Sequence, residues 1–335
     1  MRAYRLEAFG LEHLKLLDAA PPRPGPGEVV LDVKALSLNY RDLMVVKGLY
    51  NPKLKLPATP LSDGAGVVSA VGAGVTRVRV GDKVMSHFVA DWREGPFRQE
   101  YTGTTLGTPG PGLAAEQVTV PAEAVLPLPQ GYDFAQAATL PIAALTAWSA
   151  LITVGNVQPS QVIMTLGTGG VSIFALQLAK ALGARVIITS RSDEKLDRAR
   201  KLGADHTINY EKTPAWEQMA LEFTGGTGVD LMVETAGPGT LDQSLKATRA
   251  GGTIALLGAL TGRQGQITTG LVLMKRLHIV GIMVDSRTAF DALSRFLVEH
   301  RIQPVIDQRF PFAQLPEALR YMEAGRHFGK IVVTV

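Results

Sequence analysis

Two patterns of apolar positions divide the chain. Up to about residue 126, short apolar segments such as "EVVLDVKALSL", "GAGVVSAVG" and "AEQVTV" are separated by turns such as "PPRPGPGE" and "GTPGPG". Short apolar segments between turns rich in proline and glycine are typical of a compact, mostly β domain. From residue 160 onward, apolar runs of strand length alternate with stretches whose apolar residues recur at helical spacing, which predicts strands joined by crossover helices.

The second pattern predicts a doubly wound parallel sheet of the Rossmann type. Its strands are expected at 162–166, 185–189, 206–209, 229–234, 253–257 and 278–284, and its helices at 170–182, 192–202, 214–224, 239–248 and 268–275. Two further helices and a final strand have no place in that sheet, so we expect them to return to the first domain; they lie at about 287–299, 314–324 and in "KIVVTV". The expected fold is α/β, with a nucleotide-binding domain over 127–285 and a β-rich domain over 1–126 and 286–335.

A glycine-rich turn follows the first strand of the predicted sheet. It reads Gly167, Thr168, Gly169, Gly170, Val171. Glycines let the backbone approach a ligand closely, and a helix N-terminus offers N–H groups to an anion, so the turn suits a pyrophosphate. The motif has Ser172 where a third glycine is usual, and the alternative is a helix entry that needs only close packing. The strands and helix around the turn favour dinucleotide binding.

The end of the second predicted strand carries hydroxyls and cations. Ser190 and Arg191 stand where NAD-preferring sites have an acid, and Lys195 follows one turn later. Asp193 and Glu194 lie nearby, on the first turn of a helix, where acids are favoured by the helix dipole alone. Because arginine can bind a phosphate with two hydrogen bonds, this segment predicts NADP(H) as cofactor. The alternative is a solvated helix start without a ligand.

Composition narrows the class of protein. The chain has 335 residues, of which 46% are hydrophobic and 19% charged, as in ordinary globular proteins of two domains. The net charge is +4, but basic and acidic residues are interleaved, so nucleic-acid binding is not expected. The absence of cysteine excludes disulfides, thiolate nucleophiles and cysteine-ligated zinc. No signal peptide or membrane-spanning run is seen, so we expect a cytoplasmic protein without membrane association.

The whole chain resembles the medium-chain dehydrogenase/reductase superfamily. The matching strings, in order, are "PGPGEVVLDVKALSLNYRD", "GAGVVSAVGAGVTRVRVGDKV", "AATLPIAALTAWSAL", "GTGGVSIFALQLAKALGA", "LGADHTINY" and "GRHFGKIVV". The resemblance implies a GroES-like catalytic domain beside the Rossmann domain. It places the three zinc ligands of the alcohol dehydrogenases on Asn39, Ser62 and Ile142, which make no zinc site in that arrangement. His87 and Asp91 are not expected to bind metal either.

With the zinc-dependent alcohol dehydrogenases excluded, the sequence is similar to the zinc-free quinone oxidoreductase branch of the superfamily. That resemblance implies transfer of hydride from NADPH to a small hydrophobic acceptor, either a quinone or an α,β-unsaturated carbonyl compound. It also implies a proton donor at Tyr50 and a place beside the nicotinamide for Asn39 and Thr146. Tyr210 and Arg326 are implied near the adenosine phosphate. Leu257, Gly258 and Met283 end the fifth and sixth strands, where such sheets bind ligands.

Several alternatives stay open. Tyr50 can be a loop aromatic, Asn39 a turn residue, and the strand-end residues ordinary packing. The acceptor cleft suggested by the sequence is apolar or aromatic and includes Asn39, Tyr50, Phe88, Trp92 and Met283. The chain can also be an enoyl thioester reductase, or a non-catalytic NADPH-binding protein of the crystallin-like or RNA-associated kind. The apolar sixth strand, "LHIVGIMVD", is an expected sheet edge, so we predict a homodimer in which two such edges pair.

Overall fold

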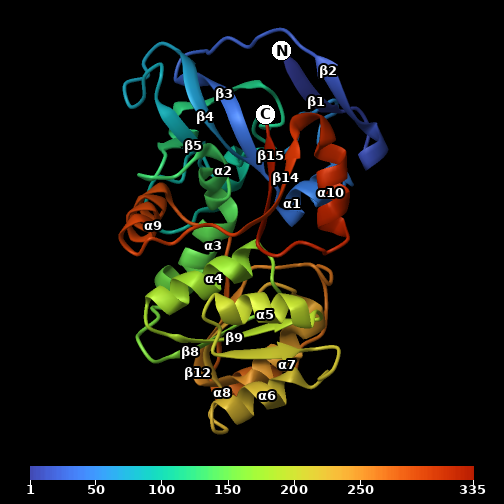
Figure 1. Cartoon of the computed structure of the whole chain (residues 1–335), viewed down its shortest axis with the longest axis vertical. Coiled ribbons are helices and arrows are strands. Elements are labelled where there is room, and N and C mark those ends of the chain that lie inside the picture. Colours follow the sequence, from blue (N-terminus) through green and yellow to red (C-terminus); the bar gives the residue numbers. More distant parts are fainter. The chain divides into compact units, whose positions relative to one another are not determined.

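The computed structural model describes residues 1–335 and contains two compact units (Figure 1). The first unit consists of Met1–Ala143 and Ser286–Val335, and the second of Ala144–Asp285. The first boundary falls after Ala143 and not after the expected residue 126. The residues around 126 still belong to the sheet of the first unit. There β7 (Val125–Pro127) pairs with β5 (Lys83–Ser86). No helix of either unit has the length and apolar character needed to cross a membrane.

The first unit is built around a seven-stranded sheet with the order β14-β15-β3-β4-β5-β7, in which β6 also pairs with β3. Apart from β5 and β7, its strands are β3 (Glu28–Ser37), β4 (Asp63–Val71), β6 (Gln117–Pro121), β14 (Ile306–Pro311) and β15 (Lys330–Thr334). One edge of β3 is shared by β6 and β15, and β4 runs along the other edge. β3 is paired along both edges, and most of its residues are buried.

Besides short 3-10 and π turns, two short strands and four α-helices complete the first unit. The strands β1 (Arg2–Leu6) and β2 (Leu14–Asp18) form a hairpin, and the helices are α1 (Tyr40–Val46), α2 (Phe134–Ala137), α9 (Arg287–Glu299) and α10 (Leu315–Glu323). The return segment shares the core of this unit. Phe312 is buried against the ring of Tyr4, and the Tyr4 hydroxyl donates a 3.0 Å hydrogen bond to the Phe312 carbonyl.

The second unit confirms the doubly wound sheet. Six parallel strands lie in the order β10-β9-β8-β11-β12-β13, which reverses at β8. They are β8 (Val162–Thr165), β9 (Arg185–Ser190), β10 (His206–Asn209), β11 (Val229–Glu234), β12 (Thr248–Leu256) and β13 (His278–Gly281). The reversal point of such a sheet is where ligands bind, at the carboxyl ends of the strands. The glycine-rich turn follows β8, so it lies at that point.

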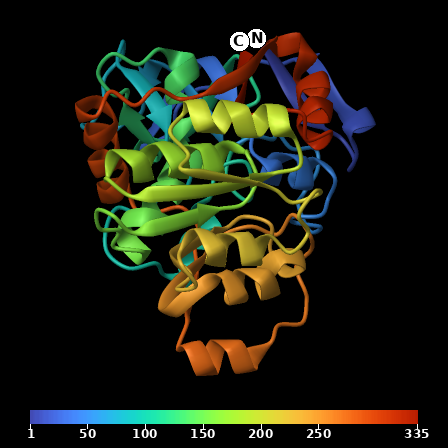
Figure 2. The same ribbon diagram turned by 60° about the horizontal axis from the view of Figure 1, so that its bottom comes forward.

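Helices cover both faces of the parallel sheet (Figures 1 and 2). They are α3 (Leu145–Trp148), α4 (Gly170–Ala181), α5 (Asp193–Lys201), α6 (Trp216–Phe223), α7 (Pro238–Ala247) and α8 (Thr269–Lys275). The last strand is shorter than the expected 278–284. It ends at Gly281 because its partner β12 ends at Leu256, the residue that pairs with Gly281. Met283 therefore lies beyond the strand.

Candidate functional site

The turn between β8 and α4 has open space around its glycines. Gly167 has a φ of 72°, in the left-handed region that favours glycine, and Gly169 is the N-cap of α4. A Cβ atom added at either residue would meet no other heavy atom within 4 Å. The first N–H groups of a helix lack partners within the helix. A phosphate group can therefore approach the backbone from Gly167 to Val171.

Ser172 occupies the place of the third glycine of the motif. Its side chain is buried, and its hydroxyl donates a 2.6 Å hydrogen bond to the carbonyl oxygen of Leu166. The hydroxyl of Thr235 donates to the same oxygen at 2.7 Å. The serine thus packs α4 against the end of β8 with its polar atom satisfied, and the irregular motif leaves the turn open.

The end of β9 lies next to the glycine turn. The Gly167 N–H donates a 3.0 Å hydrogen bond to the Thr189 hydroxyl, which joins the two segments. The Ser190 hydroxyl accepts from the Ser192 N–H at 3.2 Å, and the Ser192 hydroxyl accepts from the Lys195 N–H at 3.3 Å as the cap of α5. The end of β9 and the first turn of α5 thus carry a hydroxyl, a guanidinium and an ammonium group.

Asp193, the first of two acids in the first turn of α5, is paired with residues of another segment. The Asp193 carboxylate forms an ion pair with Lys212 and accepts a 2.8 Å hydrogen bond from the Asn209 side chain. These contacts, Lys212 first, hold the pKa of Asp193 below its usual value. Tyr210 follows Asn209, and burial raises its pKa while the charge of Arg191 acts to lower it. The Tyr210 N–H donates a 3.2 Å hydrogen bond to the Ser190 carbonyl, so Tyr210 lies next to the Ser190–Arg191 segment.

The other residues expected near the cofactor differ in burial and in hydrogen bonding. Leu257 and Gly258 follow β12, and both N–H groups donate to the Glu234 carbonyl, at 3.1 and 3.2 Å. A Cβ atom at Gly258 would lie 1.5 Å from the Thr235 carbonyl oxygen, so backbone packing requires glycine there. Met283 is half-buried after β13, and Thr146 is buried in α3.

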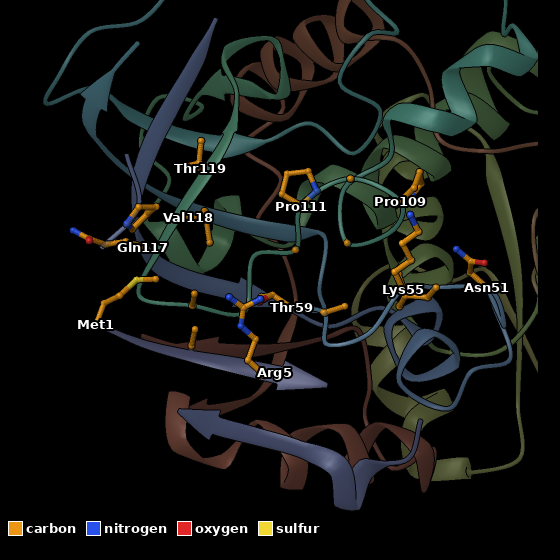
Figure 3. A pocket seen from close by; sticks show the side chains of 18 of the residues that line it. Met1, Arg5, Asn51, Lys55, Thr59, Pro109, Pro111, Gln117, Val118 and Thr119 are labelled. Atoms are coloured by element: carbon orange, nitrogen blue, oxygen red, sulfur yellow. The ribbon is translucent and has the colours of Figure 1, made fainter. Parts of the chain in front are cut away.

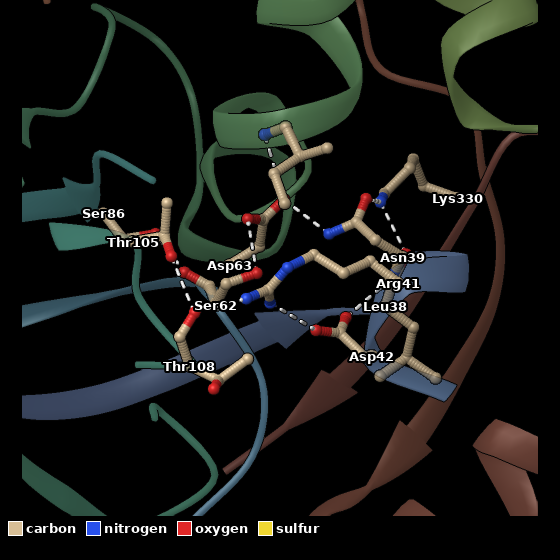
Figure 4. Close-up of polar contacts among 11 residues, drawn as sticks. Leu38, Asn39, Arg41, Asp42, Ser62, Asp63, Ser86, Thr105, Thr108 and Lys330 are labelled. Atoms are coloured by element: carbon tan, nitrogen blue, oxygen red, sulfur yellow. Dashed lines mark hydrogen bonds and ion pairs between the residues drawn. The ribbon is translucent and has the colours of Figure 1, made fainter. Parts of the chain in front are cut away.

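In the first unit, Asn39 lies in a network of buried charged groups (Figure 4). Its Nδ2 donates a 2.9 Å hydrogen bond to Oδ2 of Asp63, and its Oδ1 accepts a 2.8 Å hydrogen bond from Nζ of Lys330. The same ammonium donates to the Leu38 carbonyl at 2.6 Å. Asp63 and Lys330 have relative exposures of only 0% and 3%. The Asn39 amide is therefore fixed at both ends inside the protein.

Arg41 connects this network to Tyr50. Its guanidinium carbon lies 4.6 Å from the centre of the Tyr50 ring and 4.8 Å from that of Phe88. One Nη donates a 2.9 Å hydrogen bond to the Thr108 carbonyl, and the other is 3.8 Å from the buried carboxylate of Asp42. The Asp42 carboxylate also accepts a 2.8 Å hydrogen bond from the Asn39 N–H at the start of α1.

Burial controls the ionisation of this network. Loss of hydration raises the pKa of Asp63 to about 7, although the charge of Lys330 acts to lower it. Burial likewise raises the pKa of Asp42 and lowers that of Lys330. The cause is common to all three groups, because removing a charge from water disfavours the charged form.

The residues that hold Asn39 are not among those expected from the sequence. The signal for them is a charged residue within an otherwise apolar string: Arg41 and Asp42 in "NYRDLMVV", Asp63 in "LSDGAGVV" and Lys330 in "FGKIVV". Charges in such strings are unusual unless they pair inside the fold.

The three positions assigned to zinc ligands meet at Asp63. Asn39 and the Ile142 backbone N–H both donate to Oδ2 of this residue, at 2.9 and 3.1 Å, and the Ser62 hydroxyl is 3.4 Å from Oδ1. An amide, a hydroxyl and a backbone N–H do not form the nitrogen- and thiolate-rich site that catalytic zinc prefers. The side chains at these positions therefore do not fit zinc.

Two of the expected site residues, Arg326 and Trp92, belong to the first unit. Arg326 is exposed in the turn between α10 and β15, in the first unit, whereas Arg191 and Tyr210 belong to the second. Trp92 is buried and packs on Phe97 and Tyr101, with ring centres 5.3 and 5.9 Å apart. Within the first unit, Trp92 is therefore part of an aromatic cluster.

A cavity of about 570 Å³ opens in the first unit (Figure 3). It lies between β1, β6 and the loops at residues 51–59 and 107–112. Its lining includes the cations Arg5, Lys53 and Lys55 and no acidic side chain. Asn51, next to Tyr50, lines one end, but Tyr50 and Asn39 do not line the cavity.

Two family models match the chain. The model described as an alcohol dehydrogenase GroES-like domain matches residues 25–130, and that described as a zinc-binding dehydrogenase matches residues 170–299. A zinc-type alcohol dehydrogenase-like protein of Schizosaccharomyces pombe is 41% identical, over 98% of this chain and 97% of its own length. Both descriptions mention zinc, but the side chains at Asn39, Ser62 and Ile142 of this chain do not fit a zinc site.

Solved structures agree over the whole chain. A putative alcohol dehydrogenase of Sinorhizobium meliloti has a TM-score of 0.93 at 39% identity, covering 100% of this chain and 98% of its own. A quinone oxidoreductase of Pseudomonas syringae has a TM-score of 0.86 at 28% identity, covering 100% and 99%. A mycobacterial protein solved as a complex with NADPH has a TM-score of 0.86 at 27% identity, covering 100% of both chains. The chain thus belongs to the medium-chain dehydrogenase/reductase superfamily, as an oxidoreductase of its quinone oxidoreductase-like branch.

Proposed function

We propose that this oxidoreductase uses NADPH to reduce a hydrophobic conjugated acceptor, a quinone or an α,β-unsaturated carbonyl compound, without zinc. The observation that carries the proposal is the segment after β9, where the Arg191 carbonyl accepts a 3.2 Å hydrogen bond from the Asn209 side chain, next to Tyr210, and Asp193 is paired with Lys212. An acid facing the ribose would repel a 2′-phosphate, whereas a guanidinium attracts it. The mycobacterial structural relative, solved with NADPH, supports the same cofactor.

The residues of the second unit fit the cofactor. Gly167, Thr168, Gly169, Gly170 and Val171 would hold the pyrophosphate at the N-terminus of α4. The adenosine 2′-phosphate would be held by Ser190, Arg191, Lys195 and Tyr210, with Arg326 as a further cation. Thr146, Leu257, Gly258 and Met283 would lie along the nicotinamide side. Bound NADPH would supply a hydride.

The residues of the first unit would meet the charge that forms on the acceptor. After hydride addition to the β-carbon, negative charge develops on the carbonyl oxygen and must be stabilised by hydrogen bonds or a proton. Asn39 has an amide N–H that Asp63 does not use, and Tyr50 has a hydroxyl that can donate. We assign Asn39 to hydrogen bonding and Tyr50 to proton donation.

The proposal is tested by the cofactor preference of the wild type and of Arg191→Ala. Loss of a charge-assisted hydrogen bond costs about 1.5–3 kcal/mol, so the variant should bind NADPH roughly ten- to a hundredfold more weakly and NADH almost unchanged. Isothermal titration calorimetry with each cofactor measures both affinities. Arg200→Ala is the matched control, because Arg200 is an exposed arginine of α5, the helix that follows Arg191, and is paired with Asp197. Equal affinity of the wild type for NADPH and NADH would overturn the proposal.

A further inference from the structure

The orientation of the Asn39 amide is set by charges on either side of it. Its oxygen faces the Lys330 ammonium and its nitrogen faces the Asp63 carboxylate, at 2.8 and 2.9 Å. Exchanging the oxygen and nitrogen would place the NH₂ group against a cation and the oxygen against a carboxylate. The amide is therefore held in one orientation, with one of its two N–H groups used by Asp63. The other N–H has no partner within the protein.

The charges come from different parts of the first unit. Lys330 begins β15, Asp63 begins β4, and Asn39 caps α1. Asp63 and Lys330 are joined through the Asn39 amide. Burying opposite charges contributes little net stability compared with apolar side chains of similar size, because both ions lose hydration. Asp63 also binds the Ile142 N–H, so all three positions assigned to zinc ligands contact one carboxylate. Apolar side chains would hold the strands together without the loss of hydration free energy that these buried charges suffer. A structural role alone therefore does not account for them.

We propose that Asp63 and Lys330 are positioning residues that hold the Asn39 amide rigid, so that its remaining N–H serves as a fixed hydrogen-bond donor for the reacting complex. The inference rests on the proposed function, because it names the residues on which the role of Asn39 depends. A donor held in place before the reaction needs no reorganisation when charge develops on the acceptor, and this is what makes such donors effective. No bond is made or broken in the network itself.

Three variants separate positioning from stability. Lys330→Met removes the donor to the Asn39 oxygen, Asp63→Asn removes the carboxylate charge, and the double variant Asp63→Asn/Lys330→Met removes both charges together. Leaving one buried ion without its partner is strongly destabilising, whereas removing both restores much of the loss. Glu217→Gln is the control, because Glu217 is a buried acid of the second unit that bonds to Gln243 at 2.7 Å.

We expect the kcat of the variants to stay low even where the unfolding temperature recovers. Misplacement of a reacting group by about 1 Å can cost 100-fold in rate, so Lys330→Met and the double variant should lower kcat by about 10- to 100-fold. The dissociation constant of NADPH and the kcat of Glu217→Gln should stay unchanged. The double variant should unfold at a higher temperature than Lys330→Met and still be slow.

Recovery of kcat together with stability in the double variant would overturn the inference, and so would a loss of NADPH affinity equal to the loss of kcat. If Lys330→Met does not fold, the double variant alone decides, by the kcat that it shows. A wild type that oxidises no NADPH with any acceptor contradicts the proposed function. An active wild type whose variants keep full kcat contradicts only the role of Asp63 and Lys330.

Discussion

Asp63 links the chemistry of the candidate site to the stability of the first unit. The folded protein raises its pKa to about 7, mainly through burial, whereas an unfolded aspartate titrates near 3.8. A raised carboxyl pKa gives a contribution to stability that is complete below the unfolded pKa and is lost as the pH rises through the folded pKa. The window for Asp63 therefore runs from about pH 4 to about pH 7.

We predict that the stability advantage of the wild type over Asp63→Asn is larger at pH 5 than at pH 8. One pKa unit corresponds to about 1.4 kcal/mol, so the difference between the two pH values should exceed about 1 kcal/mol. Asp42, Arg41, Lys330 and Asn39 face the same carboxylate or its neighbours and stay in place in both proteins, so the comparison isolates Asp63. Urea unfolding at both pH values measures it. An advantage independent of pH would contradict the raised pKa.

At the scale of secondary-structure elements, two glycines differ in whether the fold requires them: Gly169 in the β8–α4 turn and Gly258 after β12. Gly169 has a φ of −76°, which any residue can adopt, and a Cβ atom there meets nothing within 4 Å. Gly258 is the opposite case, because a Cβ atom there would collide with the Thr235 carbonyl oxygen. One glycine is therefore free of constraints from the fold, and the other is required by it.

Gly169→Ala should leave the unfolding temperature almost unchanged and weaken NADPH binding by about tenfold or more, because the methyl group fills the space that the pyrophosphate needs. Gly258→Ala should lower the unfolding temperature. Thermal unfolding and calorimetric titration of both variants measure the two effects. Undiminished NADPH affinity in Gly169→Ala would show that the open turn does not hold the pyrophosphate.

The periodicity of the sequence predicts the strands and helices from β8 to α8 within about five residues, because each carries its own apolar pattern, but it does not predict α3. The largest difference is at β12, which begins at Thr248 rather than at 253. The glycine turn and the Ser190–Arg191 segment could be located for the same reason, since they lie next to those elements in the chain. The network around Asn39 could not be predicted. Its members lie in α1, β4 and β15, and only the pairing of β3 with β4 and β15 brings them together.

At the scale of the whole molecule, the second unit has an uncovered apolar edge. The strand β13 ends the parallel sheet, and Val280 is exposed on it. The neighbouring helix α8 has no buried residue, and its Leu273 and Met274 have relative exposures of 75% and 81%. Unpaired strand edges and exposed apolar side chains favour association with another chain.

We therefore expect a homodimer in which two β13 edges pair. Sedimentation analysis at micromolar concentration should give a dimer for the wild type and a shift towards monomer for Leu273→Glu/Met274→Glu, with an unchanged circular dichroism spectrum. Leu49→Glu/Leu260→Glu is a control of equal charge at exposed leucines outside α8 and β13. A monomeric wild type would reject the pairing.

The central claim, hydride transfer from NADPH to a conjugated acceptor without a metal, is tested most directly by deuterium transfer. The protein is dialysed against a strong chelator, its zinc content is measured, and it is mixed with NADPH deuterated at the transferable C4 position and an α,β-unsaturated aldehyde. We predict deuterium on the β-carbon of the product, the same rate before and after chelation, and less zinc than protein. Tyr50→Phe should lower this rate by about 100-fold, because proton donation typically contributes 100- to 10,000-fold. A product without deuterium, or a rate that chelation abolishes and added zinc restores, would contradict the account.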